Sequence, residues 1–381
     1  MKKLKATIII DSSIINSHHG IRRYLLSLAE SIRPSFHVTF FNVEETGING
    51  ELNYSLLVFD KFFSYNNGFD RNAQIQLGSE NKILWDVLEE NKIKSDTMHK
   101  STSVYVGKEI EDSDICIIGA PWICAKINIV NGKKVYCMGY DAIPISYSFK
   151  EFNDRGLTNF GYLHHVGYQK AVRQFDGILA ISNKSKFEIS KFVGKDKITT
   201  IPPFLPIGFD SIGVDDAPRE KTVILAAPFD IRKGLNNLPE LLNDHDIKKI
   251  LIFGGVRCHH EELLKFFKSI NIEKCEWWHT VDTKKQIALY KSSSLLIFPS
   301  LNEGLGLPVL EALACGTNVV VSNIEPLNTL VGEDSILTGI PNIDKKIISS
   351  KLNCLSAVKN QRDAIEKFGG ECLSNFLIKL T

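Results

Sequence analysis

Short apolar runs of strand length alternate with amphipathic stretches along most of this chain. The strand-like runs of the first half are Leu4–Ile10, Val38–Asn42, Leu56–Phe59, Ile115–Ile118, Lys134–Gly139 and Gly177–Ile181. The amphipathic stretch Ile21–Ile32, closed by Pro34, predicts a helix after the first run. Continuous apolar runs indicate strands buried on both faces, and their alternation with helices is typical of a parallel α/β sheet.

The alternation restarts after Thr200–Arg219, a segment rich in proline and glycine that is typical of a connection between domains. The elements expected beyond it are strand Thr222–Ala226, helix Asn237–Asp244, strand Lys249–Phe253, helix Glu261–Ser269, strand Cys275–His279 and helix Lys284–Ser292. Leu355–Leu380 predicts a closing amphipathic helix, whereas residues 60–110 carry no regular pattern. The pattern predicts two doubly wound, Rossmann-like domains joined by a linker.

Composition restricts the class of protein only broadly. A length of 381 residues favours two domains, and 44% hydrophobic and 23% charged residues are ordinary for a globular protein. A formal net charge of +1 gives no overall attraction to nucleic acid, so no nucleic-acid partner is expected. The eight cysteines include no C-x2-C pair, which favours a reduced, cytoplasmic setting. The first apolar run stops at Asp11, too early for a signal peptide, and no segment approaches the roughly 20 apolar residues of a membrane span.

Two apolar runs, Leu295–Pro299 and Thr317–Ser322, enclose a short loop and a short helix. Pro308 suits the first helical position and Gly316 the left-handed residue past the end, so the helix is expected over about 308–315. In a strand–loop–helix–strand unit, the helix N-terminus faces the carboxyl end of the sheet. Free N–H groups and the positive end of the helix dipole attract phosphate there.

Two glutamates eight positions apart, Glu303 and Glu311, border this helix start. Between them, Gly304 and Gly306 let a ligand approach the backbone closely because they lack a Cβ. Carboxylates repel phosphate, but they accept hydrogen bonds from the paired hydroxyls of a sugar ring or a ribose. A phosphate flanked by hydroxyl-rich rings is the outline of a nucleotide sugar. Taken alone, each glutamate could also be an ordinary solvated charge near a helix start.

The motif EGLGLPVLEALACG, residues 303–316, resembles the E-x7-E donor-binding signature of the retaining glycosyltransferases of family 4. It departs from the usual form at Leu305, where the family has phenylalanine. The resemblance extends over nearly the whole chain and implies the GT-B architecture, an α/β fold with two Rossmann-like, doubly wound domains facing a cleft. It implies an acceptor-binding domain over residues 1–200, a nucleotide-sugar-binding domain over 201–355, and a helix over 356–381 that crosses back to the first domain.

By that resemblance, Glu303 contacts the transferred sugar and Glu311 contacts the ribose. Gly304, Leu305 and Gly306 complete the donor-binding loop between them.

The adjacent cations Arg232 and Lys233 follow strand Thr222–Ala226, where a strand meets a helix. Arg and Lys at such a turn can clamp a diphosphate, although a solvated basic loop has the same composition. Family 4 sequences carry a similar pair, and the resemblance implies that these cations neutralise the leaving diphosphate. With the cations and the helix start in that role, no metal and no cofactor is expected.

Two further elements lie in the first half. Gly20, in HHGIRRY, resembles the family's Gly-rich element after the first strand, which implies close approach to the donor phosphate or the acceptor; a plain turn is the alternative. Tyr140 and Asp141, in YDAIP, resemble the H-D-L-I-P element of bacterial mannosyltransferase-like members, whose His contacts the donor sugar. Tyr140 replaces that His. Asp141 could accept a hydrogen bond from a sugar hydroxyl or cap the strand end.

Two remaining patterns concern partners. Asn183–Lys197 interleaves five lysines with apolar residues, so it could rest on the inner face of an anionic membrane or pack its apolar stripe on its own domain. Three His-His pairs occur, but adjacent side chains point apart, so they do not predict a zinc site.

The sequence therefore predicts a metal-independent, retaining hexosyltransferase that uses a GDP- or UDP-sugar. The YDAIP and RKG elements favour mannose from GDP-mannose, transferred to a glycan or lipid-linked acceptor in surface polysaccharide (lipopolysaccharide or capsule) biosynthesis. Three alternatives stay open: a sugar-nucleotide epimerase, a phosphorylase on the same scaffold, and a catalytically silent nucleotide-sugar-binding subunit, which Tyr140 in place of His would suit.

Overall fold

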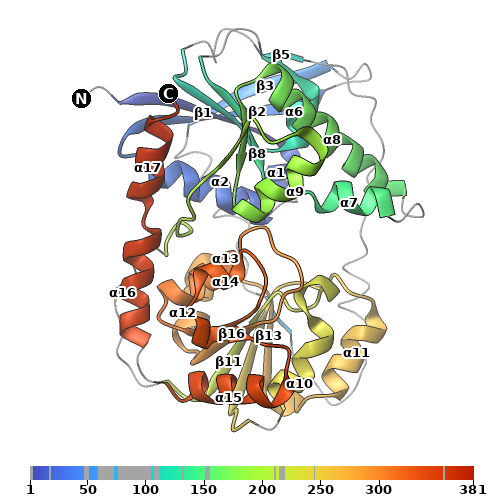
Figure 1. The fold of residues 1–381 in the computed structure, drawn as a ribbon, viewed down its shortest axis with the longest axis vertical. Coiled ribbons are helices and arrows are strands. Elements are labelled where there is room, and N and C mark those ends of the chain that lie inside the picture. The colour runs from blue at the N-terminus through green and yellow to red at the C-terminus, as the bar shows by residue number, and fades with distance from the viewer. Residues whose placement is uncertain are drawn as a thin grey trace. The chain divides into compact units, whose positions relative to one another are not determined.

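The structure is a computed structural model that describes residues 3–16, 19–46, 51–58, 73–75, 104–106, 112–129, 133–150, 155–209, 212–213, 219–243, 245–354 and 357–381. The chain divides into two compact units. Unit 1 comprises Met1–Asn67, Ser95–Ile207 and Gly369–Thr381, and unit 2 comprises Gly68–Lys94 and Gly208–Phe368. Each unit is built around one seven-stranded sheet (Figure 1).

The sheet of unit 1 has the order β10-β9-β8-β6-β1-β2-β3. Its strands are β1 (Leu4–Asp11), β2 (Phe36–Thr46), β3 (Glu51–Val58), β6 (Ile115–Ile118), β8 (Val135–Gly139), β9 (Gly177–Ala180) and β10 (Ile198–Thr200). All neighbours pair in parallel except β2 and β3. Every residue of β6, β8 and β9 is buried, which explains their continuous apolar sequences. A separate parallel pair joins β5 (Val104–Val106) and β7 (Ile127–Ile129).

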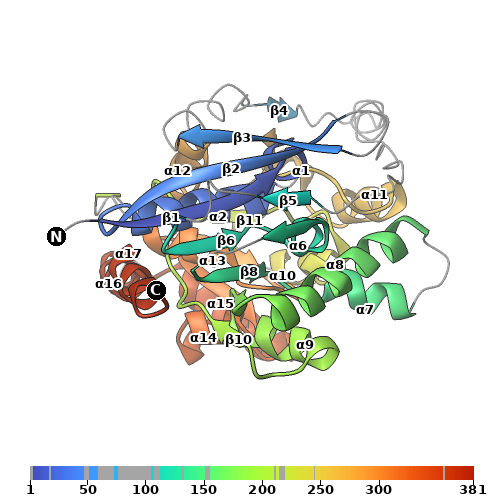
Figure 2. The same ribbon diagram turned by 90° about the horizontal axis from the view of Figure 1, so that it is seen from above.

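Helices of unit 1 connect these strands. They are α1 (Ser12–Asn16), α2 (His19–Ile32), α6 (Pro121–Lys126), α7 (Ile143–Lys150), α8 (Arg155–Gln174), α9 (Asn183–Val193) and α17 (Gly370–Ile378). Figure 2 shows β1, β2, β6 and β8 side by side, with α8 and α9 beyond β8. The last helix, α17, packs against α2, and the Ser374 hydroxyl donates to the Ser35 hydroxyl over 2.9 Å.

The sheet of unit 2 has the order β16-β15-β14-β11-β12-β13-β4. Its strands are β4 (Ala73–Ile75), β11 (Thr222–Ala226), β12 (Lys249–Phe253), β13 (Cys275–Thr280), β14 (Leu295–Phe298), β15 (Asn318–Ser322) and β16 (Ile336–Leu337). All pair in parallel except β4, which runs antiparallel along β13. A strand from the first half of the sequence therefore forms an edge of the second sheet.

The helices of unit 2 are α10 (Leu238–Leu242), α11 (His260–Lys268), α12 (Thr283–Lys291), α13 (Leu307–Ala314), α14 (Leu327–Leu330), α15 (Pro341–Leu352) and α16 (Ala357–Phe368). Between the sheet and its helices lies an aromatic cluster in which Phe229 packs edge-on against Phe266 and Trp277, with ring centroids 5.6 and 4.7 Å apart. All three side chains are buried. Burial of such rings supplies much of the stabilisation of a core.

The prediction of two doubly wound, Rossmann-like domains is confirmed. The closing segment differs from the expectation of one helix, because it forms two, α16 and α17, separated at Gly369. Gly369 has extended backbone angles, φ −63° and ψ 156°, so the first helix ends there and the second begins. Helix α16 packs against α13 in unit 2, whereas α17 belongs to unit 1. None of the described helices is long and apolar enough to cross a membrane.

Candidate functional site

The candidate site of unit 2 lies in the loops that follow β11 and β14. These two strands are neighbours in the sheet, with Val223 opposite Leu295. From β11 the chain moves outward through β12 and β13, and it then returns to β14 on the other side of β11. In open α/β sheets, ligands bind outside the carboxyl ends of the strands at such a reversal.

The loop after β11 carries the basic pair. Asp230 begins a short 3₁₀ turn, Ile231–Lys233, by accepting a hydrogen bond from the Arg232 N–H over 2.9 Å. Gly234 ends the turn in the left-handed region, with φ 77°. A Cβ at this position would stand 2.0 Å from the Pro299 carbonyl oxygen in the loop after β14. Glycine is therefore required here, and the close approach brings the two loops together.

Lys233 and Glu303 form a buried ion pair across the two loops. The Lys233 ammonium donates to Oε1 of Glu303, and Glu303 is only 7% exposed. The same oxygen accepts a hydrogen bond from the Ser300 hydroxyl over 2.7 Å. Burial lowers the pKa of Lys233, and the neighbouring Glu303 carboxylate opposes that shift. The pair therefore holds one cation and one anion at the carboxyl edge of the sheet.

Arg232 lies on the outer side of this pair. Its Nη1 donates to the Asn302 carbonyl over 2.8 Å and stands 3.9 Å from Glu303 Oε1. Its Nη2 stands 3.6 Å from an Asp230 oxygen, and a quarter of the side chain is exposed. The fold thus brings together the three residues that the sequence predicted to contact one ligand, Arg232, Lys233 and Glu303.

Helix α13 begins directly after this loop. Gly306 precedes it with a left-handed φ of 87°, and a Cβ there would stand 2.5 Å from Leu327 Cδ2. Gly316 beyond the helix is also left-handed, with φ 70°, as predicted. Leu305 is only 4% exposed, so its side chain packs inward and only its backbone could meet a ligand. Gly304 is half-buried beside it.

Glu311 lies deeper than the sequence suggested. It is the fifth residue of α13, at the start of the second turn, and it is 1% exposed. Its Oε2 accepts hydrogen bonds from Gln286 Nε2 over 2.5 Å and from the Tyr290 hydroxyl over 3.1 Å. Both donors come from α12, and the sequence analysis did not identify them. Their spacing of four residues on one helix face is the signal that could have found them.

In unit 1, Tyr140 directly follows β8. Its hydroxyl donates to the Gly119 carbonyl over 2.9 Å, and its ring packs edge-on against Tyr24 with centroids 5.7 Å apart. Burial raises the pKa of Tyr140, so its hydroxyl stays protonated at neutral pH. The Tyr140 hydroxyl thus donates to a backbone carbonyl of its own unit.

The Asp141 side chain makes a capping contact at the start of α7, not at the strand end. Its Oδ1 accepts a hydrogen bond from the Ile143 N–H over 3.0 Å at the start of α7. The Tyr168 hydroxyl donates to the Asp141 backbone carbonyl over 3.1 Å, so main chain and side chain are both held. Gly20 lies in the first turn of α2 and is exposed, and among the described residues no atom outside its chain neighbours and its own helix backbone lies within 4 Å of a Cβ built there.

The sequence did not point to Asp11, which also lies at the carboxyl end of a strand in the sheet of unit 1. Asp11 ends β1, and its Oδ1 accepts hydrogen bonds from the Ser13 hydroxyl over 2.7 Å and the Ile14 N–H over 3.0 Å. Its Oδ2 accepts a hydrogen bond from Trp122 Nε1 over 2.9 Å. A lone Asp at a strand end carries no motif, so only the structure shows these contacts.

Acidic residues in the triplet pattern D-x-D occur at residues 112–114 in unit 1 and 244–246 in unit 2. Asp112 and Asp114 precede β6, where Asp114 accepts a hydrogen bond from the Lys5 N–H over 2.8 Å. Asp246 precedes β12 and pairs with Lys221 over 2.8 Å, and Asp244 lies outside the described residues. These positions are at the amino ends of strands. Among the described residues, no group of three or more His, Cys, Asp or Glu side chains could hold a metal ion.

Comparison with known proteins agrees with this geometry. Residues 214–369 match the model of the family described as glycosyl transferases group 1. A serotype-specific mannosyltransferase of Escherichia coli, WbdA, is 24% identical over 227 residues, which cover 53% of this chain and 27% of the relative. O-antigen chain mannosyltransferase B of Escherichia coli is 39% identical over 56 residues, 15% of each chain. The chain spans about a quarter of the length of the WbdA relatives.

Solved structures show the same fold. The Anabaena protein HepE in complex with UDP superposes with a TM-score of 0.63 at 14% identity, over 99% of both chains. WaaG, a glycosyltransferase involved in lipopolysaccharide biosynthesis, superposes with a TM-score of 0.59 at 10% identity, also over 99% of both chains. These likenesses confirm the GT-B fold expected from the sequence. Residues 214–369, which match the model of the glycosyl transferases group 1, hold the RKG turn and the E-x7-E motif.

Proposed function

We propose that this chain is a retaining glycosyltransferase that moves a hexose from a nucleotide sugar to a hydroxyl of a glycan or lipid-linked acceptor. The observation that carries the proposal is the buried pair of Lys233 and Glu303 beside Arg232, at the carboxyl ends of β11 and β14. It offers cations for a diphosphate and a carboxylate for sugar hydroxyls at one place.

In this proposal, unit 2 binds the donor. Arg232 and Lys233 bind the diphosphate together with the backbone of Gly304, Leu305 and Gly306, since free N–H groups at the start of α13 favour anions. Glu303 accepts hydrogen bonds from the transferred sugar. Glu311 accepts hydrogen bonds from the ribose hydroxyls. Every one of these groups comes from the described part of unit 2.

For unit 1 we propose acceptor binding and a contact between Asp141 and a sugar hydroxyl. Gly20 is exposed at the start of α2 and leaves its backbone open to a ligand. Asp141 and Tyr140 follow β8 and are held by hydrogen bonds to Ile143 and Gly119. A sugar contact by Asp141 would use its carboxylate beyond the cap that it already forms.

The reaction breaks the bond between the anomeric carbon and the leaving phosphate oxygen. The acceptor oxygen forms the new bond to that carbon, and its proton passes to the leaving diphosphate in a same-face route. In a double displacement, an enzyme carboxylate holds the sugar between two inversions. Negative charge grows on the leaving group in both routes, and Arg232 and Lys233 stabilise it without a metal.

For the donor we propose GDP-mannose, and for the pathway surface polysaccharide assembly. Support comes from the mannosyltransferases WbdA of Escherichia coli and RfbU of Salmonella typhimurium, which match 53% and 25% of this chain. HepE was solved with UDP, so UDP-sugars are the competing donors.

We extend the proposal to a peripheral contact with the inner face of the cytoplasmic membrane. On α9, Ile189 is buried, so the apolar stripe packs on unit 1, but Phe187 is 60% exposed beside Lys191. Tyr162 on α8 is 67% exposed. Exposed rings among lysines suit an anionic membrane surface. Sedimentation with phosphatidylglycerol vesicles should exceed that with phosphatidylcholine vesicles and fall in Phe187→Ser; equal sedimentation would refute the contact.

The decisive experiment incubates the purified protein with a panel of GDP- and UDP-sugars and measures nucleoside diphosphate release with and without lipid-linked glycan extracts. We expect acceptor-dependent release with one donor, loss in Glu303→Gln, and an unchanged rate in EDTA. The anomeric configuration of the product, read by NMR, tests retention. If no donor binds or turns over and Glu311→Ala changes nothing, the proposal is wrong.

A further inference from the structure

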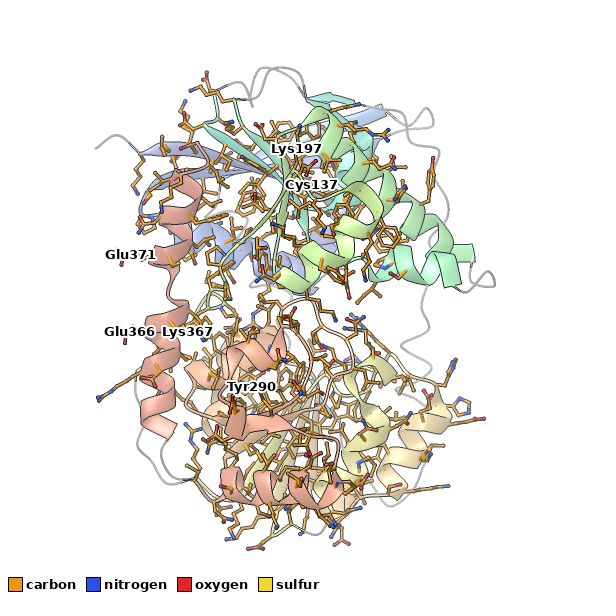
Figure 3. All side chains as sticks on the ribbon, in the orientation of Figure 1. Cys137, Lys197, Tyr290, Glu366, Lys367 and Glu371 are labelled. Atoms are coloured by element: carbon orange, nitrogen blue, oxygen red, sulfur yellow. The ribbon has the colours of Figure 1, made fainter. Side chains whose placement is uncertain are left out.

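Two side chains of α12 hold the carboxylate of Glu311. Gln286 Nε2 and the Tyr290 hydroxyl both donate to its Oε2, over 2.5 and 3.1 Å. Residues four positions apart share one face of a helix, so both donors reach α13 from the same side. Figure 3 labels Tyr290 within unit 2.

These three groups are enclosed by the protein. Gln286 and Glu311 are 6% and 1% exposed, and Tyr290 is fully buried. A carboxylate removed from water needs donors from the protein, and donors to a charged acceptor form strong, directional bonds. Gln286 and Tyr290 therefore fix the position of the carboxylate.

Tyr290 is itself rigidly placed. Its ring packs edge-on against Phe253, with centroids 5.6 Å apart, and its backbone carbonyl accepts a hydrogen bond from the Thr317 hydroxyl over 2.7 Å. Thr317 lies just beyond α13. Tyr290 is thus hydrogen-bonded both to Glu311 within α13 and to Thr317 just beyond it. These two contacts hold the Tyr290 hydroxyl at a fixed position relative to the Glu311 carboxylate.

We propose that Gln286 and Tyr290 are positioning residues that orient Glu311 toward the ribose hydroxyls of the bound nucleotide. This inference rests on the proposed function, in which Glu311 accepts from those hydroxyls. Neither residue touches the ligand. Both hold the carboxylate in one orientation, so that little side-chain entropy is lost when the ribose binds. The arrangement selects a ribonucleotide over a nucleotide that lacks the hydroxyls.

The test is isothermal titration with GDP, UDP and their 2′,3′-dideoxy counterparts. Tyr290→Phe removes one hydroxyl and keeps the ring, and Gln286→Met removes the other donor at similar volume. Each variant should weaken ribonucleotide binding roughly threefold to tenfold and leave dideoxynucleotide binding unchanged. In the Glu311→Gln background, adding Tyr290→Phe should cause little further loss of ribonucleotide affinity, because Tyr290 acts only through the Glu311 carboxylate.

Ser293→Ala is the matched control. Ser293 is fully buried just beyond α12, and its hydroxyl donates to the Leu289 carbonyl over 2.7 Å, with no bond to Glu311. It should keep the affinities for all four nucleotides. Thermal unfolding of each variant verifies that unit 2 is folded.

The possible outcomes separate the two proposals. If Tyr290→Phe and Gln286→Met weaken ribo- and dideoxynucleotides equally, or weaken neither, the positioning role is wrong while nucleotide binding stands. If the wild-type protein binds neither GDP nor UDP, the proposed function is wrong, and this inference falls with it.

Discussion

Replacing Lys233 with methionine would leave Glu303 as an uncompensated carboxylate in a buried place. Removing one partner of a buried ion pair typically costs about 3–5 kcal/mol, because the remaining charge has lost its counterion. Glu303 would keep the Ser300 hydroxyl at 2.7 Å and the Arg232 guanidinium at 3.9 Å. These contacts offset part of the loss, so we expect unit 2 to lose about 2–3 kcal/mol.

The double variant Lys233→Met/Glu303→Gln should recover about 1–2 kcal/mol, because the unpaired charge is gone. Lys221→Met is the matched control, since Lys221 pairs with the largely exposed Asp246, and such a surface pair contributes about 0–1 kcal/mol. Urea unfolding monitored by tryptophan fluorescence provides the free energies, with Trp277 and Trp278 reporting on unit 2. A Lys233→Met loss no larger than that of Lys221→Met, or no recovery in the double variant, would refute the reasoning.

Three further outcomes test the structure. Gly234→Ala should destabilise unit 2 by more than about 2 kcal/mol in urea unfolding, since its Cβ would stand 2.0 Å from a carbonyl oxygen at a positive φ, whereas Gly20→Ala, with open space around it, should not. Arg219→Met should cost about 2–4 kcal/mol in the same assay, because its guanidinium donates to the carbonyls of Cys315 and Gly316 beyond α13 and of Ser293 beyond α12. The pKa of Asp114 is lowered chiefly by the hydrogen bond from the Lys5 N–H and secondly by the hydrogen bond from the Lys133 side chain. The ionised carboxylate therefore stabilises the fold above pH 3.8, and this stabilisation is lost as the pH falls through the lowered pKa. Asp114→Asn should flatten the dependence of unfolding on pH in this acid range, and an unchanged dependence would contradict this.

The fold was accessible from sequence because its strands are nearly uniform apolar runs. Leu295–Phe298 and Asn318–Ser322 are strands within one residue of their expected bounds, and Gly316 has the predicted left-handed φ of 70°. Local pattern was enough in each case, because burial on both faces and a helix end each leave a residue signature. The break at Gly369 was not predicted, since a single glycine inside an amphipathic pattern does not show that the helix ends there or that the next helix belongs to the other unit.

The candidate site was accessible only in part. Its residues were found through a motif, but the bond between Lys233 and Glu303 joins positions 70 residues apart, and no local pattern encodes it. The donors to Glu311 and the inward side chain of Leu305 depend on how α12 and α13 pack. Likewise, the sequence leaves open whether Asp141 is a cap or a ligand contact, and only the structure shows its hydrogen bond to the Ile143 N–H. Partner choice is a tertiary property, so these contacts had to be observed.

The edge strand β4 has a consequence for anyone who wishes to express the second half of the chain alone. A fragment beginning at Gly208 would contain the sheet from β16 to β13 but would lack Ala73–Ile75. Its β13 would present a row of unpaired N–H and C=O groups, with Trp278 on that strand, and bare edges of this kind recruit other chains into aggregates. Excision at the proline-rich connection therefore leaves an incomplete sheet, and a shorter protein built on this unit would need its own strand or a charged substitution to close that edge.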